Sequence, residues 1–168
     1  MKDEAKSQLK KIIGDYDEKL AQVERVDAAN RAAHAAFPGR FATLRAETIQ
    51  PALQEIADLL NERGHAASVR EQEDSSSAVG GVKSAAISLR VVPKPFAHKS
   101  AENNPVVIEV TFSANRSERK VAVSSTNTMM SHAGTVGKRG EYEIEAVTAD
   151  VVTSHVIQTL TEAFGGPR

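Results

Sequence analysis

The chain has 168 residues, a formal net charge of −1 and no cysteine; 40% of its residues are hydrophobic and 26% are charged. This length and composition predict one globular domain spanning residues 1–168. The balanced charge disfavours bulk attraction to nucleic acid or to an acidic membrane. The lack of cysteine excludes disulfides, thiolate nucleophiles and cysteine-ligated metal centres.

The expected location of the protein is the cytoplasm. Its first residues, MKDEAKSQLK, alternate charged and apolar side chains and lack the continuous apolar core of a signal peptide. No apolar run approaches the roughly 20 residues that a membrane-spanning helix needs. We therefore expect a soluble protein without a membrane partner.

A long amphipathic helix is predicted over residues 1–36. Its apolar residues recur at steps of four and three, which is the spacing of a stripe on one helical face. The stripe consists of Leu9, Ile13, Tyr16, Leu20 and Val23. The segment FPGR at 37–40 is predicted to end the helix, because proline disfavours helix at the residue before it and glycine permits a turn. Either the rest of the domain or a partner covers the stripe, and two well-populated heptads are too few to establish a coiled coil.

A second helix is predicted over residues 41–64. Apolar residues again recur at helical spacing, and Gly64 stands where a C-terminal cap belongs. Pro51 lies inside this pattern, where it either kinks one long helix or opens a new one at its first turn. We expect a break or a kink near residues 48–51.

Beyond residue 65 the apolar period changes from helical to alternating, which is typical of half-buried strands. Five strands are predicted, at 66–72, 82–92, 105–114, 118–125 and 141–147. Because no helix separates them, these strands favour an antiparallel meander across residues 66–147.

The last element is a helix over residues 148–164. Thr148 or Asp150 stands near its start, and glycine follows its end. The predicted fold class is therefore α+β: two N-terminal helices, a five-stranded antiparallel meander sheet, and one C-terminal helix packed on one face of the sheet.

Alternate connections of a meander lie at the same end of the sheet. The predicted connections at 93–104 and 126–140 therefore share one end, and both are longer than a hairpin needs. They carry cations and a glycine-rich stretch, whose backbone N–H groups can bind an anion. The candidate ligand-binding residues are His98, Lys99, His132, Lys138 and Arg139.

Familiar motifs do not explain this loop end. The stretch 134–139 has the wrong spacing for a phosphate-binding loop, and a strand is predicted after it where that motif needs a helix. Ser131 and His132 are sequence neighbours that do not face each other in an extended chain. The histidines lack metal-ligand spacing, and no aromatic row suggests binding of single-stranded nucleic acid. We therefore predict no catalytic residue, metal or cofactor.

Three functions from different classes remain. The first is a non-catalytic binding or assembly module that acts through homo-oligomerisation, such as a homodimer, or through a protein partner on the helical stripe. The second is a small-anion or nucleotide-binding protein that uses loops 93–104 and 126–140. The third is an enzyme with its site at the same loop end, which ranks last because its histidines lack a carboxylate partner.

Overall fold

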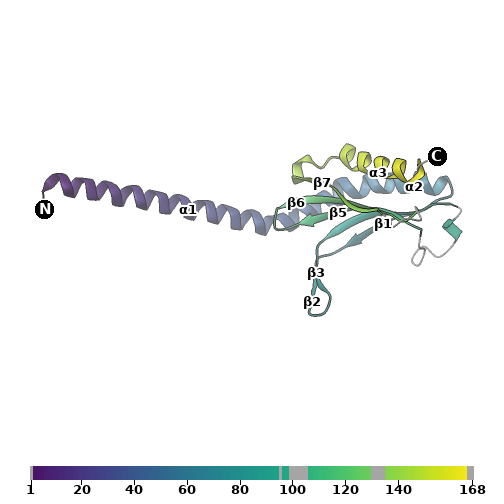
Figure 1. Ribbon diagram of the computed structural model, residues 1–168, viewed down its shortest axis with the longest axis horizontal. Coiled ribbons are helices and arrows are strands. Elements are labelled where there is room, and N and C mark those ends of the chain that lie inside the picture. Colours follow the sequence, from purple (N-terminus) through teal and green to yellow (C-terminus); the bar gives the residue numbers. More distant parts are fainter. Residues whose placement is uncertain (1, 95, 99–105, 130–134, 166–168) are drawn as a thin grey trace. The chain divides into compact units, whose positions relative to one another are not determined.

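The computed structural model describes residues 2–94, 96–98, 106–129 and 135–165. The chain divides into two compact units, residues 1–37 and residues 38–168. The fold class is α+β, as predicted: a long N-terminal helix precedes a five-stranded antiparallel sheet, and a C-terminal helix closes the chain (Figure 1).

The first helix, α1 (Asp3–Leu44), is longer than predicted. The predicted stop at residues 37–40 is wrong, because Pro38 lies inside the helix. A proline there costs about 3 kcal/mol. Phe37 and Phe41 flank it one turn apart and are 2% and 0% exposed. Burying two such rings contributes roughly 1.5–3 kcal/mol each, which offsets the cost of the proline.

The irregularity predicted near residues 48–51 takes the form of a π-helical segment. This segment, η1 (Arg45–Ile49), joins α1 to α2 (Gln50–Glu62) with helical backbone throughout, and Pro51 is the second residue of α2. Arg45 is buried, and its Nη2 donates to Glu73 Oε1 at 2.5 Å. The π-helical segment therefore places the guanidinium of Arg45 beside Glu73, the residue that follows the first strand of the sheet.

The sheet is the predicted meander, with strand order β1-β4-β5-β6-β7 and antiparallel pairing throughout. Its strands are β1 (Ala66–Gln72), β4 (Ala86–Val92), β5 (Ile108–Asn115), β6 (Lys120–Asn127) and β7 (Thr135–Tyr142). The predicted strand at 82–92 is divided in two. Its first residues instead belong to a separate hairpin formed by β2 (Ser75–Ser77) and β3 (Gly81–Lys83).

The last strand begins earlier than predicted. Residues 135–140 were expected in a loop but form most of β7, whereas residues 144–146 form a short 3₁₀ turn, η3 (Ile144–Ala146). The glycines of this stretch have a structural role in at least one place. A Cβ on Gly140 would lie 2.9 Å from the ring of Tyr142, so the glycine makes room for that ring. The register between β6 and β7 shifts between Val123 and Ser124, where a β-bulge interrupts the pairing.

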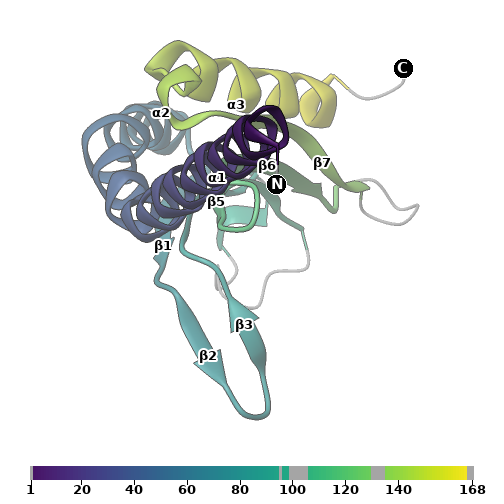
Figure 2. The same cartoon turned by 90° about the vertical axis from the view of Figure 1, so that its left-hand side faces the viewer.

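The two faces of the sheet differ in character. The buried apolar residues of β5 and β6 point to one face together with Ile87, Leu89 and Val91 of β4. On this face α2 packs on β1 and β4, and α3 (Ala149–Phe164) packs on β5 and β6 (Figure 2). The Thr148 side chain caps α3 by accepting from Val151 N. The opposite face carries mainly polar residues, and none of the described α-helices packs on it; we call it the open face, although Val92 at the end of β4 is buried there.

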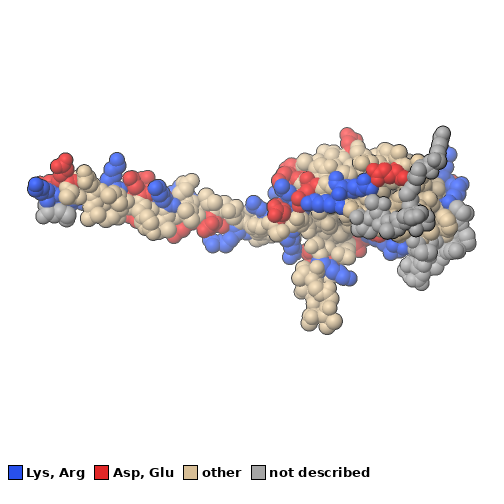
Figure 3. All heavy atoms as spheres, viewed as in Figure 1, with Lys and Arg blue, Asp and Glu red and all other residues tan. Residues whose placement is uncertain are grey.

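The β2–β3 hairpin extends from the sheet on the side opposite α2 and α3 (Figures 1 and 2). Val79 at its tip and Val82 are 99% and 81% exposed. Figure 3 shows the hairpin as uncharged atoms with basic atoms near its base, whereas acidic and basic atoms are mixed along α1.

Candidate functional site

The first candidate surface is the apolar face of α1, which we call the apolar stripe. It contains every large apolar residue between positions 2 and 36, and each of these side chains is 45% to 64% exposed. At 100° per residue they fall within a sector about 140° wide. The stripe consists of Leu9, Ile12, Ile13, Tyr16, Leu20, Val23 and Val26.

The stripe has a defined C-terminal limit. Beyond Val26 the same sector of the helix carries Asp27, Asn30 and His34, which interrupt the apolar face. The four-three spacing in the sequence predicts five of the seven members but not Ile12 and Val26. Both lie at the same angular edge of the stripe, outside the sector of the five predicted residues, so a wider angular window would have found them.

The predicted anion-binding residues do not form a described cluster. Lys99 and His132 lie outside the described residues. His98 ends the short turn η2 (Phe96–His98), and the structure does not describe its side chain. Lys138 and Arg139 lie within β7. An anion site or an active site at this loop end therefore stays a prediction.

Carboxylates engage both described cations of that prediction. Lys138 Nζ donates to Glu141 Oε2 at 2.9 Å. The guanidinium of Arg139 donates to both carboxylate oxygens of Glu162 on α3, at 3.0 and 2.5 Å, and its Nε donates to Ser125 Oγ at 2.6 Å. These bonds hold the pKa of Glu141 and that of Glu162 below their usual value. Arg139 thus links the edge strand β7 to α3 through an ion pair.

A polar seam continues this contact between α3 and the sheet. Tyr142 Oη and His155 Nε2 lie 2.7 Å apart in a hydrogen bond, and the His155 ring meets the edge of Phe112 at 6.4 Å between centroids. Burial, and then the charge of Arg139, lowers the pKa of His155. The neutral imidazole is therefore the form that the folded protein favours.

The contact of His155 with Tyr142 predicts that the free energy of unfolding depends on pH. Because the folded pKa of His155 lies below its ordinary value of about 6.5, the unfolded state binds more protons just below that pH, and stability falls as the pH drops. We expect His155→Gln to be less stable than the parent at about pH 7.5, since the Tyr142 contact changes, and the gap to narrow at about pH 5.5. Thermal unfolding midpoints at both pH values measure the gap. A gap of constant size would contradict the role of His155.

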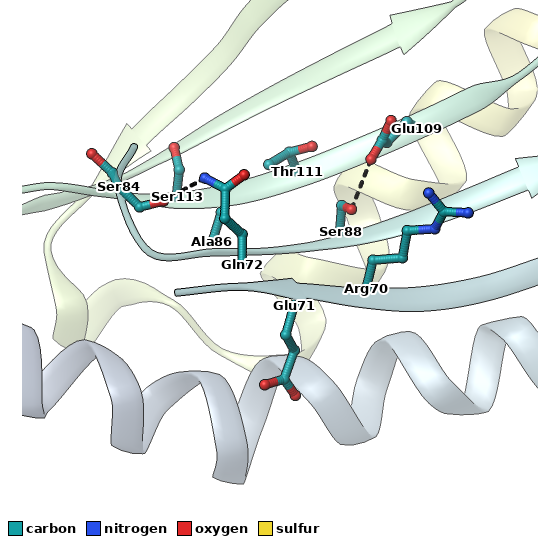
Figure 4. Close-up of a pocket in the computed structure, with 9 residues that line it drawn as sticks. All are labelled: Arg70, Glu71, Gln72, Ser84, Ala86, Ser88, Glu109, Thr111 and Ser113. Carbon is teal, nitrogen blue, oxygen red and sulfur yellow. Dashed lines mark hydrogen bonds between the residues drawn. The ribbon is translucent and has the colours of Figure 1, made fainter. Parts of the chain in front are cut away.

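The second candidate surface is a groove on the open face of the sheet (Figure 4). Its volume is about 480 Å³. Adjacent strands place polar side chains in rows across it: Arg70 lies opposite Ser88, and Ser88 lies opposite Thr111. The lining residues are Arg70, Glu71, Gln72, Ser84, Ala86, Ser88, Glu109, Thr111 and Ser113.

Hydrogen bonds hold two of the groove's side chains in place. Ser88 Oγ donates to Glu109 Oε1 at 2.8 Å, and Gln72 Nε2 donates to Ser84 O at 2.8 Å. Figure 4 shows Glu71 pointing to the side opposite the other labelled side chains. The groove was not predicted, because alternation along a strand marks its polar positions but not the register that aligns them with those of the neighbouring strands.

The comparisons with known proteins add no relative. No family model matches the chain, and neither curated proteins nor solved structures include a match to it. Among the described residues, no helix is both long and apolar enough to cross a membrane, and no group of three or more acidic or histidine side chains is arranged to hold a metal ion.

Proposed function

We propose that this protein is a non-catalytic assembly module that forms a homodimer through the apolar stripe of α1. The observation that carries the proposal is the exposure of seven large apolar side chains on one helical face. Contiguous apolar surface of this kind typically marks an interaction site. A helix with such a face stabilises itself by packing the face against another element.

The spacing of the stripe supports a pair of helices as the packing arrangement. Ile13 and Leu20 occupy the a positions of a heptad, and Leu9, Tyr16 and Val23 occupy the d positions. Residues at a and d are the ones that interlock across a two-stranded coiled coil. The aliphatic a residues and the short length favour a dimer of modest affinity.

The charges beside the stripe support a second copy of this chain, in parallel orientation. In a parallel pair, a g residue meets the e residue five positions later on the partner helix. Lys19 occupies g and Glu24 occupies e, so opposite charges meet twice by symmetry. In the antiparallel register that overlaps the whole stripe, Asp17 meets its own copy and Lys19 meets its own copy. Like charges therefore disfavour that orientation.

The first test is the mass of the full-length protein. Sedimentation equilibrium across micromolar concentrations is expected to show a species at twice 18.0 kDa that dissociates on dilution. A monomer throughout this range contradicts the proposal.

Single cysteines test the orientation, because the chain has none of its own. Ile13→Cys and Val23→Cys, each alone, are expected to form covalent dimers under mild oxidation, since a parallel pair brings identical positions within disulfide reach. An antiparallel pair brings position 13 near position 23 of the partner helix. Crosslinking that occurs only when the two variants are mixed would therefore contradict the parallel arrangement. Ser7→Cys, on the opposite face of the helix, is the control that should not crosslink.

A further inference from the structure

The groove on the open sheet face has the size of a small-molecule site. Its volume of about 480 Å³ lies in the range of roughly 300–1,000 Å³ that is usual for ligand pockets. Its lining is unusual in holding no aromatic residue and, apart from Ala86, no aliphatic one. A ligand of this groove therefore binds through hydrogen bonds and charge, and a nucleobase would find no ring to stack on.

The groove holds one cation that the protein does not use. Arg70 is exposed, and among the described residues its side chain has no hydrogen-bond or ion-pair partner. Every other arginine of the sheet is engaged: Arg90, for example, lies 3.8 Å from Glu109 in an ion pair. A guanidinium offers a fork of donors that fits a carboxylate or a phosphate. Arg70 is thus placed to hold one anionic group.

The remaining groups suit hydroxyls. Glu109 accepts one hydrogen bond from Ser88 through Oε1, and an ionised carboxylate has further acceptor sites. The hydroxyls of Thr111 and Ser113 lie on the same face of β5 as Glu109, because they alternate with its buried residues. Gln72 donates to Ser84 O, which orients its amide oxygen as an acceptor. The groove therefore combines one cation with several donors and acceptors.

We propose that this groove binds a sugar acid or a sugar phosphate. The anionic group lies at Arg70. The sugar hydroxyls donate to Glu109, Gln72 and Ser113, whose own hydroxyl donates to Ala122 O, and they accept from Thr111. The site does not depend on the helical dimer, since all its residues belong to the second compact unit.

Calorimetric titration of the full-length protein tests the proposal with five probes: glucuronate, glucose 6-phosphate, glucose, acetate and inorganic phosphate. Glucuronate, glucose 6-phosphate or both are expected to bind at least about tenfold more tightly than each of the other three. Binding of glucuronate alone identifies a carboxylate as the anionic group, and binding of glucose 6-phosphate alone identifies a phosphate. Failure of both to bind, or equal binding of inorganic phosphate, overturns the proposal.

Substitutions of groove residues test whether the sugar acid or sugar phosphate binds in the groove. Arg70→Ala is expected to weaken the tightest probe at least about tenfold, and Arg70→Lys to weaken it less, because lysine keeps the charge but not the fork. Glu109→Gln is expected to weaken the sugar probes and to leave acetate binding unchanged. Arg63→Ala, an exposed arginine outside the groove, is the matched control that should change nothing. Equal affinity of Arg70→Ala and the parent overturns the proposal.

Discussion

Replacing both Ile13 and Leu20 with glutamate is expected to make the protein monomeric at every accessible concentration. Each substitution removes an a-position side chain whose full burial is worth roughly 1.5–3 kcal/mol, and a dimer loses four of them. Each also places a carboxylate in the interface, where burial without a partner is costly. A dimer of micromolar affinity, about 8 kcal/mol, does not survive that loss. Sedimentation equilibrium measures the result.

A charge-matched control separates the stripe from the added charge. Ser7→Glu with Gln22→Glu adds the same two carboxylates outside the apolar stripe of α1, where both positions are exposed. This double variant is expected to remain a dimer. If both double variants stay dimeric, the stripe is not the interface; if both become monomeric, net charge rather than the stripe controls assembly. Unchanged thermal unfolding of the sheet unit in each variant would show that only assembly was altered.

The largest loss of stability is expected from Phe112→Ala. Phe112 lies at the centre of the sheet, 0% exposed, between Ile87 on β4 and Val123 on β6. Its removal leaves a cavity that neighbouring strands close only in part, at a cost of about 3–5 kcal/mol in the free energy of unfolding. The thermal midpoint should fall by roughly 10 °C or more. Urea denaturation followed by circular dichroism measures the change in free energy.

The adjacent residue provides the control for this prediction. Thr111 lies one position earlier on β5 and points to the open face. Thr111→Ala is expected to change the free energy of unfolding by less than about 1 kcal/mol, because no packed neighbour is lost. Similar losses in the two variants would mean that helices α2 and α3 do not cover the face of the sheet on which Phe112 lies.

Local sequence patterns predicted most of the elements. Alternation in β5 and β6 is regular because one face of each strand is buried and the other is open, so the sequence carries a period of two. The start of α3 was predicted because Thr148 caps it through its own side chain. Both signals are local, and a local signal can be found without knowing the tertiary structure.

The elements predicted wrongly depend on distant contacts. Pro38 and Gly39 resemble a helix stop, yet α1 continues through them because the flanking phenylalanines are buried. The glycine-rich stretch at 135–140 resembles a loop, yet it pairs with β6 as an edge strand and is fastened by the contact of Arg139 with α3. In each case tertiary packing outweighs the local preference.

The sequence by itself predicted the α+β class, an antiparallel meander and most of the apolar stripe of α1. Hydrophobic periodicity marks the helices and strands, and the lack of a helix between the strands favours the meander. Only the tertiary structure decided which polar residues meet. It paired Arg139 with Glu162 and aligned Arg70 with Ser88 across neighbouring strands. Strand register and helix placement determine these meetings, and a shift of one residue would move every side chain to the other face. The physical reason is that hydrophobic periodicity is a property of residues near one another in the sequence. A binding site is formed by residues from different strands and helices, which only the tertiary structure brings together.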